Sequence, residues 1–269
     1  MLDIPRSTYY EALIHEPSNK EIEFIAFGHQ VALAYAESKG RYGAPKIHQV
    51  LLRAGISCSI KRVQRHMRRL KLSSITVKKY KPQKSNTPVP EDKVDLLKQD
   101  FKADAPNQKW ATDITYIHTL KDGWTYLACV LDLYLHKIIG YTYDRQMTAE
   151  MATKALRNAT LNVKDTTGII IHSDLGSQYT SQAFEDYVTE KKMLHSFSRK
   201  GNPYDNACIE SFHAVLKKEE VYTSVYYDFE EAQKAIFEYI ESWYNRKRIH
   251  ESLNYMTPQE KEDEFFNVA

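Results

Sequence analysis

The chain has 269 residues, of which 42% are hydrophobic and 27% are charged, and its formal net charge is +2 at pH 7. This composition fits one large or two ordinary globular domains, and it excludes a disordered, collagen-like or coiled-coil protein. The longest apolar stretch, residues 126–135, is too short to cross a membrane, and the N-terminus lacks the apolar run of a signal peptide. Three dispersed cysteines exclude a disulfide framework, so we expect a cytoplasmic protein with no membrane partner.

Basic residues are concentrated in the first part of the chain. Residues 1–104 contain 19 Lys and Arg against 11 Asp and Glu, whereas the remainder contains 18 against 24. Residues 39–84 contain 14 basic side chains and no acidic one. Such a run indicates a surface that binds a polyanion, above all nucleic acid, although a solvated basic face would have the same composition.

Residues 1–77 are predicted to form a helical module. Thr8 and Glu11 have the spacing of a capping box, and residues 21–38 favour a helix. Pro45 suits the first turn of the next helix, which Gly55 is expected to end. Ser59 is expected to cap a further helix whose apolar side consists of Ile60, Val63, Met67 and Leu70.

A helix, a short turn containing glycine and a basic helix form the outline of a helix-turn-helix, whose second helix binds DNA. The basic side chains predicted to contact DNA are Lys61, Arg62, Arg65, Arg68 and Arg69. Three of them, Arg62, Arg65 and Arg69, are spaced by three and four residues and are predicted to form one stripe opposite the apolar side. The alternative is a plain helical hairpin, in which the arginines serve only to keep the protein soluble.

A composition change separates this module from the rest of the chain. Residues 78–104 are predicted to be a linker, because their first part contains three prolines and little apolar content. Strands are predicted at 109–119, 124–133, 137–143, 168–172 and 194–198, and helices at 148–162, 180–192, 205–220 and 229–246. The first strands are joined by tight turns and the later ones alternate with helices, which predicts a mixed sheet covered by helices over 105–225 and a helical extension over 226–269.

Three carboxylates have placements that suggest chemistry. Asp113 lies in the middle of the first strand, where a charge is costly unless it is paired or bound to metal. Asp174 directly follows a buried strand, and Glu210 lies early on a helix. If the three converge, their oxygens would bind Mg²⁺ or Mn²⁺, and a pair of ions about 4 Å apart can promote phosphodiester cleavage. For each acid alone, a salt bridge or a helix cap is the simpler explanation.

Competing chemistries lack their motifs in this sequence. It contains no GxxxxGK[ST], no GxSxG and no HExxH, which argues against a phosphate-cradling loop, a serine hydrolase elbow and a zinc peptidase helix. His172 and His195 lie near the acidic residues in sequence order. Either could move a proton, although a structural role explains each more simply.

Four segments resemble the motifs of integrase-like transposases of bacterial insertion sequences, the DDE group. WATDITYI and HSDLGSQYTS resemble the two Asp motifs, and SRKGNPYDNACIESFHAVLKKE resembles the Glu motif, with 35 residues between Asp174 and Glu210. WYNRKRIHESLNYMTPQE resembles the C-terminal signature of this group. The segment YGAPKIHQVLLRAGISCSIKRVQRHMRRLKL resembles its helix-turn-helix module.

The resemblance implies a ribonuclease-H-like α/β domain, with a mixed five-stranded sheet and helices on both faces, preceded by the all-α module. It implies that Asp113, Asp174 and Glu210 are catalytic metal ligands for a pair of Mg²⁺ or Mn²⁺ ions and that Lys217 contacts DNA near the reacting phosphate. The activity it implies is cleavage and strand transfer at insertion-sequence ends.

The resemblance also implies partners. These are terminal inverted repeats, target DNA, other copies of the chain in a synaptic complex, and the product of an upstream reading frame fused to this one. The expected location is the nucleoid of a bacterial cytoplasm. Two alternatives stay open, a nuclease of the same fold that only hydrolyses DNA and a non-catalytic DNA-binding protein derived from a transposon.

Overall fold

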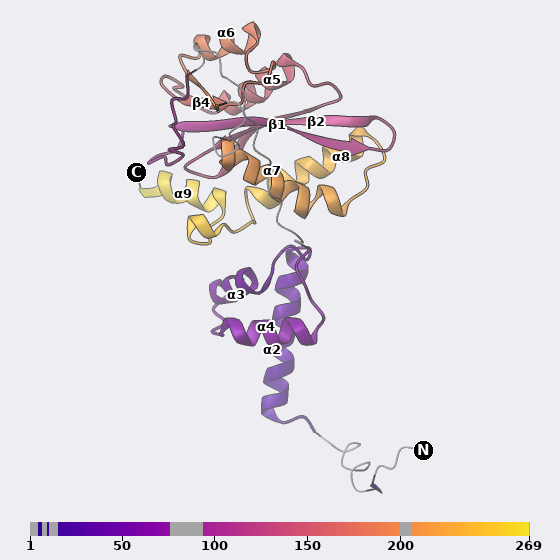
Figure 1. Ribbon diagram of the computed structural model, residues 1–269. Helices are drawn as coiled ribbons and strands as arrows, with labels where there is room; N and C mark the ends of the chain where they lie inside the picture. Colours follow the sequence, from indigo (N-terminus) through magenta and orange to yellow (C-terminus); the bar gives the residue numbers. More distant parts are fainter. Residues whose placement is uncertain (1–4, 7–9, 11–15, 76–93, 200–205, 269) are drawn as a thin grey trace. The chain divides into compact units, whose positions relative to one another are not determined.

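The computed structural model describes residues 5, 6, 10, 16–75, 94–199 and 206–268. The chain divides into two compact units, residues 1–77 and 78–269 (Figure 1). The capping box predicted at Thr8 and Glu11 lies outside the described residues, as does the entire Pro-containing stretch of the predicted linker, residues 78–92.

The smaller unit is helical in its described part. Its helices are α2 (Asn19–Glu37), α3 (Ala44–Arg53) and α4 (Ile60–Arg69). A capping box starts α2, since the Ser18 hydroxyl accepts from the Glu21 amide and the Glu21 carboxylate accepts from the Ser18 amide. As predicted, Ser59 caps α4 through its side chain. The turn between α3 and α4 contains Gly55 at φ +79°, a conformation that glycine adopts without strain.

The larger unit contains the predicted five-stranded mixed sheet. Its strands are β1 (Lys109–Thr119), β2 (Gly123–Asp132), β3 (Lys137–Asp144), β4 (Ile170–Ser173) and β5 (Leu194–Phe197). They lie in the order β3-β2-β1-β4-β5. β2 is antiparallel to both β1 and β3, because tight turns join these strands, whereas β4 is parallel to β1 and β5.

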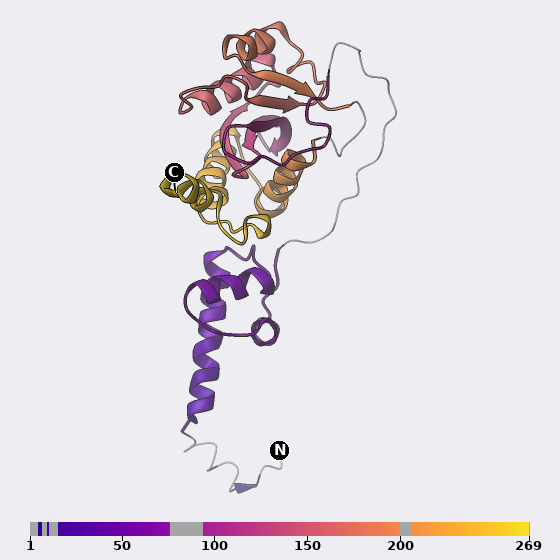
Figure 2. The same cartoon turned by 90° about the vertical axis from the view of Figure 1, so that its left-hand side faces the viewer.

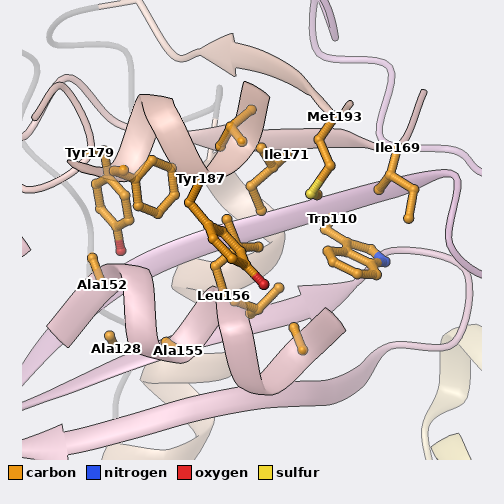
Figure 3. Packing of buried hydrophobic residues seen from close by; sticks show 14 of the residues in the cluster. Trp110, Ala128, Ala152, Ala155, Leu156, Ile169, Ile171, Tyr179, Tyr187 and Met193 are labelled. Atoms are coloured by element: carbon orange, nitrogen blue, oxygen red, sulfur yellow. The ribbon is translucent and has the colours of Figure 1, made fainter. Parts of the chain in front are cut away.

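Helices cover both faces of the sheet (Figures 1 and 2). α5 (Ala149–Thr160) and α6 (Gln182–Glu190) lie on one face. Between them and the sheet is a core of buried side chains that includes Trp110, Leu156 and Ile171 (Figure 3). α5 approaches β3 so closely that a Cβ atom at Gly140 would lie 2.4 Å from the backbone nitrogen of Ala159. Glycine at this position therefore sets the spacing between helix and sheet.

The other face carries α7 (Ala207–Glu219) and α8 (Phe229–Phe237). The helix predicted over 229–246 is present to Tyr244, but its second half, η3 (Glu238–Tyr244), is wound as a π-helix. Tyr239 and Trp243 of this segment both donate hydrogen bonds to the buried Glu219 carboxylate at the end of α7.

Two short 3-10 helices, η2 (Val221–Thr223) and η4 (Glu251–Leu253), and the terminal helix α9 (Pro258–Val268) complete this side of the unit. None of the described helices combines the length and the apolar character that crossing a membrane requires. Residues 94–104, at the end of the predicted linker, lie along the sheet edge, where the Phe197 amide donates to the Val94 carbonyl and Leu97 is buried.

Candidate active site and nucleic-acid interface

The parallel strands β1 and β4 separate beside the first predicted acid. β4 pairs with β1 only at Lys109, Trp110 and Ala111, so from Thr112 onward β4 no longer covers that edge of β1. Asp113 lies at this opening, and Asp174 follows the last residue of β4. Because parallel strands end on the same side of a sheet, the two acids lie at the end where α/β folds bind ligands.

The third acid, Glu210, lies in the first turn of α7. One helical turn later, the ring of His213 is buried, and its Nδ1 atom lies 3.3 Å from an Asp113 carboxylate oxygen. This contact joins the helix that carries Glu210 to the strand that carries Asp113. This contact was missed from the sequence.

The electrostatics of the site couple the three acids through Asp113. Partial loss of solvent raises the pKa of Asp174, and the negative charge of Asp113 raises it further, against a hydrogen bond from the Gly176 amide. Partial loss of solvent also raises the pKa of Glu210, again with a contribution from Asp113. The charge of Asp113 thus repels the charges of the other two acids, and a bound cation would relieve this repulsion.

The turn after β4 holds Asp174 by a backbone hydrogen bond. The Gly176 amide donates to Asp174 Oδ1 over 2.9 Å. A Cβ atom at Gly176 would lie 2.8 Å from that oxygen and would displace the carboxylate. The glycine in HSDLGSQY is therefore explained by the close approach of an acidic side chain to the backbone.

The donor set at this opening is chemically suited to a hard cation, because Asp113, Asp174 and Glu210 offer only carboxylate oxygens. Within the part of the chain that the structure describes, no group of three or more His, Cys, Asp or Glu side chains is assembled closely enough to hold a metal ion. The suitability of this site for a metal therefore rests on the carboxylate chemistry of its residues and on the repulsion between Asp113 and the other two acids. The described side chains do not form a preassembled coordination site.

Lys217 lies two turns after Glu210 on α7, near Asp113. Burial lowers the pKa of Lys217, and the Asp113 carboxylate partly offsets that effect. A half-buried cation beside a carboxylate cluster is suited to receiving a phosphate oxygen.

The two histidines named from the sequence have structural roles. His172 is fully buried, and its Nδ1 atom lies 2.8 Å from the Ser196 hydroxyl. His195 lies between the Ser173 hydroxyl, at 2.9 Å from Nε2, and Glu185, at 3.2 Å from Nδ1. His172 therefore connects β4 to β5, and His195 connects β5 to β4 and α6.

A buried ionic cluster, also missed from the sequence, holds the far end of α7. Glu219 accepts hydrogen bonds from the Tyr239 hydroxyl, the Trp243 indole and the Arg248 guanidinium, at 3.0 to 3.1 Å. The donors come from the C-terminal signature and the π-helix before it. The signature thus supports the helix that carries Glu210, a relationship with no local sequence pattern.

Two arginines of the predicted stripe, Arg62 and Arg69, also contact aromatic rings of α2. The Arg62 guanidinium pairs with Glu23 at 2.8 Å and lies over the Phe27 ring. The Arg69 guanidinium lies over the Phe24 ring. Arg62 is partly buried at the border of the buried face, whereas Arg69 remains exposed to solvent.

His66, which was not among the predicted apolar residues, is buried beside Val63 and Met67, whereas Ile60 and Leu70 are exposed. The residues on the free face of α4 are exposed and spaced by four and three; they are Lys61, Arg65 and Arg68. This basic stripe, which we call the α4 stripe, is the part of the module suited to DNA contact.

Comparison with known proteins identifies the family. Residues 103–203 and 191–258 match two family models described as Integrase core domain, and residues 26–80 match an HTH-like domain. The chain is 37% identical to the transposase for insertion sequence element IS904 of Lactococcus lactis, over 91% of this chain and 97% of the relative. It belongs to the insertion-sequence transposases with an integrase core domain.

Other relatives agree with this membership. Transposase InsF for insertion sequence IS3A of Escherichia coli is 38% identical, over 87% of this chain and 81% of the relative. Among solved structures, the integrase catalytic core domain of HTLV-2 aligns with 59% of this chain and 98% of its own, at 16% identity and a TM-score of 0.45. The family models and the curated relatives confirm the predicted family, and with the five-stranded mixed sheet they confirm the integrase-type catalytic fold and the helix-turn-helix-like module.

Proposed function

We propose that this transposase cleaves DNA at insertion-sequence ends and joins the freed end to target DNA in a metal-dependent reaction. Asp113, Asp174 and Glu210 are the proposed catalytic metal ligands. The observation that supports the proposal is the placement of Asp113 and Asp174 where β1 and β4 separate, with the helix that carries Glu210 in contact with Asp113 through His213. Repulsion between like charges is costly for a fold unless a cation offsets it.

The proposed reaction consists of two phosphoryl transfers. In the first, a water oxygen attacks a phosphodiester phosphorus at the transposon end, and the departing oxygen leaves as a 3′-hydroxyl. In the second, that 3′-oxygen attacks a target phosphodiester and displaces the target's own 3′-oxygen. Each step breaks one P–O bond and forms another, so neither step requires ATP.

The residues divide this work. A pair of Mg²⁺ or Mn²⁺ ions, held by the three acids, would supply charge neutralisation of the phosphate and activation of the attacking oxygen. Lys217 binds a phosphate oxygen beside them, and His213 keeps the Asp113 carboxylate in place. The α4 stripe positions the protein on the DNA backbone.

The proposal includes an organisation and partners. Residues 1–77 bind DNA, and residues 78–104 link this module to the catalytic domain. Residues 105–225 form the catalytic domain, and residues 226–269 form a helical extension that supports it. The substrates are the terminal inverted repeats and target DNA, and several copies act together in a synaptic complex. An upstream-frame fusion partner supplies most of the sequence recognition, and the complex acts on the bacterial nucleoid.

The test is incubation of the purified chain with labelled candidate end DNA and Mn²⁺, with nicked and joined products measured separately. Asp113→Asn, Asp174→Asn and Glu210→Gln should each lower cleavage about a thousandfold or more while DNA binding persists. Glu190→Gln, at an exposed acid of α6, is the matched control and should cleave normally. A variant of a proposed ligand that retains near-normal cleavage contradicts its assignment.

Metal exchange and the product pattern separate the alternatives. Mg²⁺ and Mn²⁺ should support cleavage, whereas Ca²⁺ should support little, because it is larger and coordinates less regularly. Nicked products without joined products would favour the nuclease. Binding without any nick, in a chain supplied with its upstream fusion partner, would favour the non-catalytic DNA-binding protein.

A further inference from the structure

A groove of about 680 Å³ lies along the end of the β1–β2 hairpin, next to Lys217. One wall is formed by side chains of β1 and β2, and the other by residues 221–226, which follow α7. The second wall is attached to the first, because the Leu120 amide donates to the Tyr226 carbonyl over 3.0 Å. None of the roles proposed above uses this groove apart from Lys217 at its margin.

Aromatic rings form most of the hairpin wall. Tyr116 lies opposite Tyr126 in the strand register, and His118 lies opposite Trp124. Neighbouring rings contact edge to face, with centroids 5.4 Å apart for Tyr116 and Tyr126 and 5.1 Å apart for His118 and Trp124. Rings in contact across two strands support one another, so the wall is preorganised.

Several of these aromatic rings are exposed to solvent. Tyr116 is 47% exposed and Trp124 is 60% exposed, and Tyr222 on the opposite wall is 73% exposed. Each carries a hydrogen-bonding group at its edge as well as an apolar face. A row of such rings is suited to a ligand that is flat, apolar on its faces and polar at its edges.

Charge and position narrow the class of ligand. Lys217, at the margin of the groove, is close enough to Asp113 to feel its charge. A cation next to a row of aromatic rings matches a nucleic-acid strand, whose phosphates alternate with stacking bases. Paired bases stack on each other and hide their faces, so only unpaired nucleotides could use the rings.

We propose that this groove binds unpaired nucleotides of the DNA end next to the reacting phosphate, with bases stacked on Tyr116 and Trp124 and the backbone on Lys217. This inference rests on the proposed function, and it adds that the substrate end is opened into single strands at the site. Stacking tolerates every base, so the groove holds the end without reading its sequence.

The test uses the full chain in EDTA, so that binding is measured without chemistry. Two probes are compared, a 12-nucleotide oligo(dT) and a 12-unit abasic strand with the same phosphates. Trp124 provides a direct signal, because the other two tryptophans, Trp110 and Trp243, are buried. Base stacking on Trp124 should quench its fluorescence with oligo(dT) and leave it unchanged with the abasic strand.

Affinities of variants give the second measurement. The wild type should bind oligo(dT) about tenfold more tightly than the abasic strand, and Trp124→Ala with Tyr116→Ala should remove that preference. The double replacement by Phe keeps the rings and should retain most of the preference. Phe237→Ala, at an exposed ring on α8, is the control for loss of an exposed aromatic.

Three results would overturn the inference. One is equal affinity of the wild type for the two probes, and another is a preference that survives the double alanine change in a folded protein, as judged by circular dichroism. The third is self-association of the wild type that the double alanine change abolishes while the base preference stays, which would make the groove a protein interface. The proposed function is tested separately, because cleavage of the end by the acidic residues does not require any of these results.

Discussion

The Nδ1 atom of His213 lies 3.3 Å from the Asp113 carboxylate, and this contact connects α7 to the central strand of the sheet. Because Glu210 is one turn earlier on the same helix, the contact determines which side of α7 faces the opening between β1 and β4. A histidine that orients a carboxylate acts on the site through that carboxylate.

His213→Ala should therefore weaken metal use without abolishing cleavage. We expect the Mn²⁺ concentration at half-maximal rate to rise by roughly tenfold, as is typical when a partner of a metal ligand is removed. His213→Asn retains a side-chain amide near Asp113 and should restore part of the loss. An unchanged metal dependence in His213→Ala, with normal folding, would show that the contact only packs the helix.

The raised pKa values of Asp174 and Glu210 predict a pH-dependent stability of the metal-free protein. A carboxyl with a raised folded-state pKa is harder to ionise in the native state, so it lowers stability at pH values above that pKa. Below the unfolded pKa of about 4 both states are protonated and the penalty disappears.

Asp113→Asn removes one source of this penalty. The free energy of unfolding at pH 8 in EDTA should rise by about 0.5 kcal/mol, a small value because Asp174 and Glu210 are solvent-screened. The gain should vanish near pH 4. Urea unfolding at the two pH values measures it, and a gain that is larger at pH 4 would contradict the assigned coupling.

Lys217→Ala should weaken engagement of the DNA end and leave the fold intact. The lysine is half-buried beside Asp113, so a phosphate oxygen can reach it only when the end is seated next to the acids. The neighbouring Lys218→Ala is the matched control. Site-specific crosslinking to end DNA, together with the cleavage rate, checks the prediction; equal effects of the two variants would assign Lys217 to general charge.

We expect the residues of the α4 stripe to contact DNA. Charge reversal of Lys61, Arg65 and Arg68 should reduce DNA affinity, and each lost phosphate contact should flatten the log–log salt dependence by roughly 0.9. Affinity should fall equally for end DNA and random DNA if the stripe only positions the protein, which is the role that we favour.

Arg62→Ala should instead affect stability. Its guanidinium pairs with Glu23 and covers the Phe27 ring, so its loss exposes part of the contact between α2 and α4. We expect the thermal midpoint to fall while the salt slope changes little. Identical salt slopes for Arg62→Ala and Arg65→Ala would show that the packed arginine also contacts phosphate.

Local patterns in the sequence determined the positions of most helices and strands of this protein. Alternating apolar residues and the Asp122–Gly123 turn predicted β1 and β2 almost to the residue, and Ser59 marked the start of α4. These features depend on neighbours in the chain, so they can be read without the fold. The family could likewise be inferred, because its motifs are short segments at regular spacings.

Tertiary structure alone decided how those segments act together. Asp113 contacts His213 across a hundred residues of sequence, Glu219 collects donors from the C-terminal signature, and Arg62 turns from the proposed DNA face to pack on α2. Each relationship depends on which helix face meets which neighbour. That choice is made by burial of apolar surface over the whole domain, and side chains far apart in sequence are brought into contact as its consequence.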